Sequence, residues 1–156
     1  MKQILVLLVF AALALAGCTS THTRVYDIQV RNETDVPITI WLTKDAPPFD
    51  AGWRSPEQVA LRAPGHDERI GGMVVPPGKT AFTGELKGRF VEHSYAWLRV
   101  YEGQYKRFSD LLSVSSKSPL RVDYPLDPGR NLLVVRHAEG RLQVDSEGQL
   151  EAPTTR

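Results

Sequence analysis

The chain has 156 residues, of which 19 are Lys or Arg and 18 are Asp or Glu, so its formal net charge is +1. This near-neutral balance argues against nucleic acid and against a polybasic membrane patch, because both need a surplus of basic side chains. About 139 residues follow the first seventeen, which is the size of one domain that buries its core without disulfide staples.

The amino terminus combines Lys2 with an apolar run over residues 4–16 that leads to Cys18, the only cysteine of the chain. A run of about 13 apolar residues is shorter than the ~20 that a membrane-spanning helix usually needs. A basic start, a short apolar segment and small residues before a cleavage point are typical of a signal peptide. We therefore expect residues 1–17 to be a targeting segment outside the fold.

Leu15, Ala16, Gly17 and Cys18 resemble the lipobox of bacterial lipoproteins, and this resemblance covers the signal segment alone. It implies that the Cys18 sulfur takes a diacylglycerol, that the peptide before it is removed, and that the new amino terminus is acylated. The mature chain would then be neutral, because Lys2 is the only charged residue removed, and it would hold no free thiol. The alternative is a secretory peptide, or an amino-terminal membrane helix, with an incidental cysteine.

Thr19 stands where the lipoproteins of Gram-negative cells carry an aspartate as their inner-membrane retention signal. The resemblance therefore implies a lipid-anchored protein of the cell envelope, in the outer membrane if the cell is Gram-negative. We expect residues 18–24 to be the lipidated Cys18 and a short tether, which reaches roughly 3.3–3.6 Å per residue when extended. Such a tether keeps the domain close to the lipid.

Beyond the tether, short runs alternate apolar and polar residues, which indicates antiparallel β-structure. The first run, residues 25–31, places Tyr26, Ile28 and Val30 on one face and Asp27, Gln29 and Arg31 on the other. The next places Val36, Ile38, Ile40 and Leu42 on one face and Thr39, Trp41 and Thr43 opposite. Residues 32–35 between them are rich in Asn and Asp and predict a turn, and Pro37 suggests an edge strand or a bulge.

A long segment with four prolines follows, from Lys44 to about Ile70. Its local signal is Ser55, followed by Pro56 and then by Gln58, which fits a capping box with proline in the first helical turn. We expect a single short helix there. A loop of this length is uncommon in a compact domain and is often functional or mobile.

The remaining runs predict further strands, separated by turns at residues 76–79, 127–129 and 138–140. We expect these strands at residues 73–75, 81–86, 93–101, 108–115, 121–126, 132–136 and 141–144. The pattern predicts an all-β domain over residues 25–146, either an antiparallel sandwich as in immunoglobulin-like domains or a small barrel. Residues 147–156 are expected to be a disordered tail.

The sequence holds no Gly-x-Ser-x-Gly, His-Glu-x-x-His or phosphate-binding glycine motif, so we expect neither an enzyme nor a cofactor. The histidines are scattered, and residues 66–68, His-Asp-Glu, fit a polar loop tip better than a metal site. Asp123 and Asp127 flank a turn without the ligand spacing of a calcium loop. Catalysis would require distant residues to converge, such as His93, Asp110 and Ser113.

The strand expected at residues 93–101 carries Tyr95, Trp97, Arg99 and Tyr101 on one face and Ala96, Leu98 and Val100 on the other. If the aliphatic face is buried, the aromatic face forms an outward platform that suits sugars, peptides or a protein partner. The alternative is that the aromatic face is the core. Trp53, in the proline-rich segment, is the aromatic residue that we expect to be most accessible, unless it pins that segment to the sandwich.

These observations favour a non-catalytic binding or scaffolding domain, held at the membrane by the lipid on Cys18. Its partner would be another envelope protein, contacted through a sheet edge or the aromatic face. The alternative is a module that binds peptidoglycan or polysaccharide through Tyr95, Trp97, Arg99 and Tyr101 together with Trp53.

Overall fold

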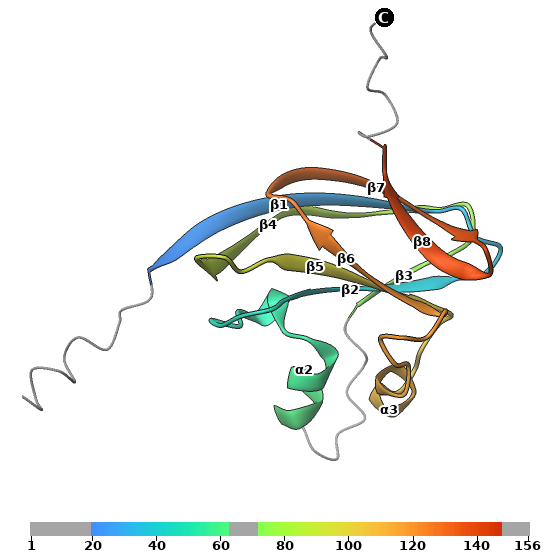
Figure 1. Ribbon diagram of the computed structural model, residues 1–156, viewed down its shortest axis with the longest axis horizontal. Coiled ribbons are helices and arrows are strands. Elements are labelled where there is room, and N and C mark those ends of the chain that lie inside the picture. The colour runs from blue at the N-terminus through green and yellow to red at the C-terminus, as the bar shows by residue number, and fades with distance from the viewer. Residues whose placement is uncertain (1–19, 63–71, 148–156) are drawn as a thin grey trace, which may run out of the picture.

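The computed structural model describes residues 20–62 and 72–147. These residues form two four-stranded sheets packed face to face, and two short helices lie on the outside of one sheet (Figure 1). The predicted all-β sandwich with a short helix in the proline-rich segment is confirmed. Cys18, residues 66–68 and most of the expected tail, residues 148–156, lie outside the described residues.

The first sheet has the strand order β4-β1-β7-β8 and the second has the order β3-β2-β5-β6. The strands of the first sheet are β1 (Thr21–Asn32), β4 (Thr80–Val91), β7 (Gly129–Ala138) and β8 (Arg141–Ser146). Those of the second are β2 (Ile38–Lys44), β3 (Met73–Val75), β5 (Ala96–Glu102) and β6 (Arg121–Leu126). The shorter elements are η1 (Ala51–Trp53), α2 (Pro56–Arg62) and α3 (Phe108–Leu112). Neighbouring strands are antiparallel, except that β1 and β7 run parallel.

The core between the sheets is built from alternate residues of the strands, as period-two patterns require. Its fully buried members include Ile28 and Val30 of β1, Ile38 of β2, and Leu98 and Val100 of β5. The aliphatic face of β5 is therefore the buried one, which is the first of the two orientations considered from the sequence.

Strand β4 changes its inward-facing residues at a bulge. Ala81 and Leu86 both pack against the core although they are an odd number of positions apart. The register with β1 shifts between Asp27 and Gln29, and Gly84 adopts a positive φ of 64°. An extra residue in one strand reverses the alternation of side chains beyond it. Odd-numbered residues of β4 therefore face the core before the bulge, and even-numbered residues face it after the bulge. A strict period-two pattern carried through this strand would therefore assign the residues after the bulge to the wrong face.

The turn at residues 32–35 is confirmed, and Asn32 closes it. Its side chain is fully buried, and its Nδ2 donates to the carbonyls of Val36 and Val75, each at 2.9 Å. Its Oδ1 accepts from the backbone N–H and the hydroxyl of Thr34, at 2.9 and 2.7 Å. One amide thus joins the end of β1 to the turn before β2 and to β3. Pro37 stands just before β2, which has strands on both sides, so the expected edge position is wrong.

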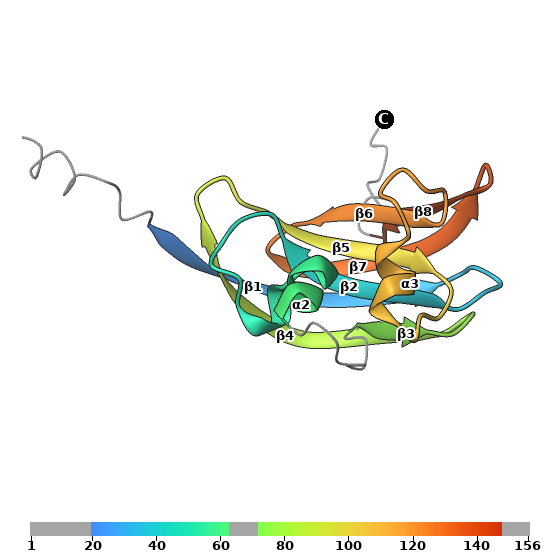
Figure 2. The same cartoon turned by 90° about the horizontal axis from the view of Figure 1, so that it is seen from below.

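The strand expected at residues 108–115 is wrong, because this segment contains α3. Phe108, Leu111 and Val114 recur every third residue and pack with Trp41 and Tyr101 in a second apolar cluster. That spacing is helical, so it was a signal available in the sequence. Figure 2 shows α2 and α3 lying over the outer face of the second sheet, which is consequently covered on both sides.

Several strand starts also differ from expectation, among them that of β7, which begins at Gly129 and not at residue 132. Residues 21–24, expected as tether, begin β1 and pair with residues 88–91 of β4, because that strand runs on to Val91 and offers them backbone partners. Strand β5 begins at Ala96 and not at residue 93, because His93 has a positive φ of 61° in the turn after β4.

Candidate functional site

The sandwich is closed on one side and partly open on the other. On the closed side, β6 contacts β8, and the Leu142 N–H donates to the Pro119 carbonyl at 3.1 Å. On the other side, edge strand β4 of the first sheet faces β3 and β2 of the second. We call the space between Ile38–Lys44 with β3 and residues 80–91 of β4 the seam.

One end of the seam is filled by the Trp53 indole, which is only 2 % exposed. Its Nε1–H donates to the Lys87 carbonyl at 3.0 Å, and its ring packs against Tyr26 and Phe90 at centroid distances of 5.1 and 5.5 Å. Gly88 makes room for it, since a Cβ there would lie 2.7 Å from Nε1. The expectation that Trp53 is the most accessible aromatic residue is therefore wrong. It is the plug that pins the proline-rich segment to the sandwich, which was the alternative.

The segment before Trp53 is tied to the same stretch of β4 by charges. The Asp50 carboxylate accepts from the Arg89 N–H at 3.1 Å and from Arg89 Nη2 at 2.9 Å. These bonds from Arg89 hold the pKa of Asp50 at about 2, below its usual 3.8. The Lys44 ammonium, whose side chain is fully buried, donates to the Arg89 carbonyl at 2.5 Å and lies 3.5 Å from Asp50. Burial lowers the pKa of Lys44 in spite of this partner.

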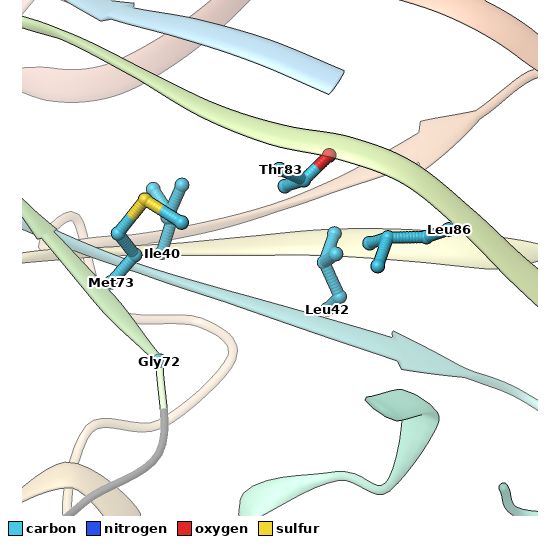
Figure 3. Close-up of a pocket in the computed structure, with 6 residues that line it drawn as sticks. All are labelled: Ile40, Leu42, Gly72, Met73, Thr83 and Leu86. Carbon is cyan, nitrogen blue, oxygen red and sulfur yellow. The ribbon is translucent and has the colours of Figure 1, made fainter. Parts of the chain in front are cut away.

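Next to Trp53 the seam contains an open cavity of about 320 Å³ (Figure 3). Its lining in the described part of the chain is Ile40, Leu42, Gly72, Met73, Thr83 and Leu86. The only polar side chain in that lining is Thr83, whose hydroxyl accepts from the Ile28 N–H at 3.1 Å and donates to the Gly84 carbonyl at 2.9 Å. The cavity is therefore apolar and carries no charge on this lining.

Strand lengths explain the cavity. Strand β2 has seven residues, whereas β3 has three and pairs only with residues 38–40. Leu42, further along β2, is left only partly buried, as is Leu86 across the seam on β4. At the opening, Met73 is 36 % exposed; Phe82 on β4 is 63 % exposed but pairs with Gln29, so it lies on the outer face of the first sheet. Exposed apolar side chains beside an apolar recess are typical of an interaction site.

The outer face of the second sheet does not form the expected aromatic platform, because helices cover much of it. Tyr101 is 1 % exposed and packs with α3 residues. Arg99 Nη1 donates to both oxygens of Glu57 of α2, at 2.9 and 2.8 Å. Only Tyr95, which is 53 % exposed and lies before β5, and the half-buried Trp97 remain accessible. With Trp53 in the seam, the five predicted binding residues are not brought together.

Charges on this face join the helices to the sheet. Burial alone would raise the pKa of Glu57, but hydrogen bonds from its own backbone, Ser55 and Arg99 bring that pKa below its usual value. Arg121 donates to Asp123 at 2.8 and 2.7 Å and to the Val114 carbonyl at 3.3 Å, which ties β6 to the chain after α3. The Asp123 carboxylate is thus already paired with the Arg121 guanidinium. These pairs have a structural role.

The residues that an enzyme would need are not gathered. His93 lies in the turn between β4 and β5, whereas Asp110 and Ser113 belong to α3 and its end, at the opposite end of the domain in Figures 1 and 2. Within residues 20–62 and 72–147, no three His, Cys, Asp or Glu side chains are grouped as metal ligands. No helix among these residues is long and apolar enough to span a bilayer.

The cavity was not predicted from the sequence. Its residues look like ordinary members of strands, and the sequence signals were the short run at Met73–Val75 and the Gly84 that interrupts β4. No protein-family model matches the chain, and comparison with curated proteins finds no significant match. The candidate site is therefore defined by its geometry: an apolar, uncharged recess between two strand edges, in the seam whose other part is filled by Trp53.

Proposed function

We propose that this protein is a lipid-anchored, non-catalytic binding domain of the cell envelope that holds another envelope component at the seam. The observation that carries this proposal is the open apolar cavity beside Trp53. Covering apolar surface gives about 25 cal/mol per Å² removed from water, so a partner that fills the recess gains affinity without any polar contact inside it.

The chemistry of the cavity supports binding over catalysis. A general acid or base needs an ionisable side chain within hydrogen-bond reach of the reacting group. The described lining has none, and the Thr83 hydroxyl is already occupied by backbone groups. Such a recess recognises shape and apolar surface.

The anchor part of the proposal rests on the lipobox resemblance and on where the fold begins. Strand β1 starts at Thr21, so only Thr19 and Ser20 separate it from Cys18, and these three residue steps reach ~10 Å at most. In cells, Cys18→Ala is expected to move the protein from the membrane to the soluble fraction, and Thr19→Ala serves as the control. Membrane association that persists in Cys18→Ala would show that the apolar segment itself is the anchor.

The binding part is tested by photocrosslinking in intact cells. A photoreactive residue replaces Leu86 in the cavity lining or, as the control, Gln143 on β8, whose side chain is exposed in the other edge strand of the first sheet. We expect one discrete adduct from position 86, lost on Met73→Lys and kept on Met73→Leu. Equal adducts from both positions, or adducts that survive Met73→Lys, would place the partner elsewhere.

A glycan-binding module remains a second candidate, because Tyr95 and Trp97 are both accessible and stand two positions apart along the chain. Flat aromatic surfaces of this kind suit sugar rings. The test is co-sedimentation of the protein with isolated peptidoglycan, in which Trp97→Ala should reduce the bound fraction. No retention of the wild-type protein by peptidoglycan or by surface polysaccharide rejects this candidate.

A further inference from the structure

The chain itself shows how the seam is filled where it is closed. Trp53 places a large apolar ring over Gly88 of β4, its backbone carbonyl accepts from the Thr43 hydroxyl of β2, and polar groups of the same segment bond to strand edges. Its indole N–H donates to the Lys87 carbonyl, and Asp50 and Lys44 bond to the Arg89 N–H and carbonyl. In this part of the seam, the apolar ring of Trp53 is thus accompanied by hydrogen bonds to the outer edge of β4.

The next stretch of β4, residues 82–86, lies beside β1 on one side. On its other side it has no strand neighbour among the described residues. Among the described residues, the side-chain bond to the backbone of this stretch is that of the Thr83 hydroxyl to the Gly84 carbonyl, whereas Asp50 and Trp53 bond to residues 87–89. An unpaired strand edge is a template for an added extended segment. Here that edge runs along the mouth of the apolar cavity.

We propose that the occupant of the cavity is a large apolar side chain, carried by an extended peptide segment of a partner protein that pairs with the outer edge of residues 82–86. This inference rests on the proposed function of the seam and names the chemistry of its ligand. The side chain enters between Leu42 and Leu86, next to the Trp53 ring. The flanking peptide residues contact Met73, which is exposed at the opening, and Phe82, which is exposed on the outer face of the first sheet.

The edge favours a peptide over an acyl chain. An acyl chain fills an apolar recess but has no donors or acceptors for the backbone of β4. An extended peptide supplies both, at the spacing of a strand. The bulge at Thr83 and Gly84 interrupts the regular edge, which limits pairing to a few residues. Specificity should therefore reside in the one anchoring side chain.

Met73 provides a reporter in the cavity wall. The chain has two methionines, Met1 and Met73, so the mature protein without residues 1–17 keeps only Met73. Methyl-¹³C-methionine labelling of the lipidated protein in lipid nanodiscs should give one methyl signal. Two signals would show that the amino-terminal segment is retained, which separates a failure of the lipoprotein proposal from a failure of this one.

The probe is the peptide acetyl-Thr-Val-Thr-Trp-Thr-Val-Thr-amide, titrated while the Met73 methyl signal is followed. We expect the signal to shift on binding, and the Kd to rise at least tenfold when the central Trp is Ala or when alternate amides are N-methylated. Leu86→Lys should weaken binding similarly, whereas Leu120→Lys, on an exposed side chain distant from the cavity lining, should not. The dispersion of the amide spectrum confirms that each variant is folded.

Three results would overturn the inference. Equal affinity of the N-methylated peptide would exclude pairing with the β4 edge. Saturation of the same methyl shift by decanoate at lower concentration than by the peptide would identify an acyl-chain site. No shift of the Met73 methyl with the Trp peptide, in a folded protein, would exclude an aromatic anchor in this cavity.

Discussion

Gly88→Ala tests the packing that closes the seam. A Cβ at this position would lie 2.7 Å from Trp53 Nε1, 2.8 Å from Phe90 Cε2 and 3.0 Å from Trp53 Cε2. Both neighbours are rings held by other contacts, so neither can move away as a flexible chain end would. Overpacking of this kind costs about 1–3 kcal/mol, and losing the bond from Nε1 to the Lys87 carbonyl adds about 1 kcal/mol. We expect a total of about 2–4 kcal/mol.

The free energy of unfolding is measured by urea titration, followed by tryptophan fluorescence, and by the thermal midpoint. A loss of this size lowers Tm by about 5–12 °C in a domain of this length. Gly52→Ala is the matched control, since nothing lies within 4 Å of its added Cβ. We expect it to stay within about 0.5 kcal/mol of the wild type. Equal stability of Gly88→Ala and Gly52→Ala would refute the role assigned to Gly88.

Three further predictions concern Asp50, Ser55 and Asn32. Because the pKa of Asp50 falls from 3.8 to about 2 on folding, its contribution is complete above pH 4 and is lost as pH falls toward 2. The stability difference between wild type and Asp50→Asn, measured by urea unfolding, should therefore shrink over that interval; a constant difference contradicts the charge argument. Ser55→Ala removes one of the two bonds of a reciprocal cap between Ser55 and Gln58 (3.3 and 2.8 Å) and should lower the free energy of unfolding by about 1 kcal/mol. Hydrogen exchange of the amides of α2 should become faster, and unchanged exchange would show that the cap does not stabilise this helix. Asn32→Asp replaces a buried donor to two carbonyls by a carboxylate and should cost more than Asn32→Ala at pH 7, which thermal unfolding can rank.

The outer cluster of the second sheet changes how the aromatic residues of β5 are interpreted. The platform orientation considered for this strand left its aromatic face exposed. In the structure Val100 is buried between the sheets and Tyr101 is buried beneath α3, so both faces are covered. The strand pattern alone could not distinguish a solvent-exposed aromatic face from one covered by a helix that begins seven residues after Tyr101.

Local signals in the sequence determined most of the secondary structure. The alternation of Tyr26, Ile28 and Val30, the cap formed by Ser55 and Gln58, and the hairpin turn at Glu139 and Gly140, both with positive φ, each involve residues within a few positions. Such interactions form within one element or turn, so they can be recognised without knowing the fold. The same holds for the lipobox resemblance around Cys18.

The candidate site was decided by tertiary structure alone. Trp53 is buried because Gly88, far along the chain, leaves space for its ring, and Leu42 is partly uncovered because β3 begins only at Met73, which pairs with Ile40. Whether a side chain is exposed depends on which distant segments lie across from it, and on where their strands stop or bulge. A sequence pattern shows which residues can be buried, but only packing between remote strands determines which recess stays open.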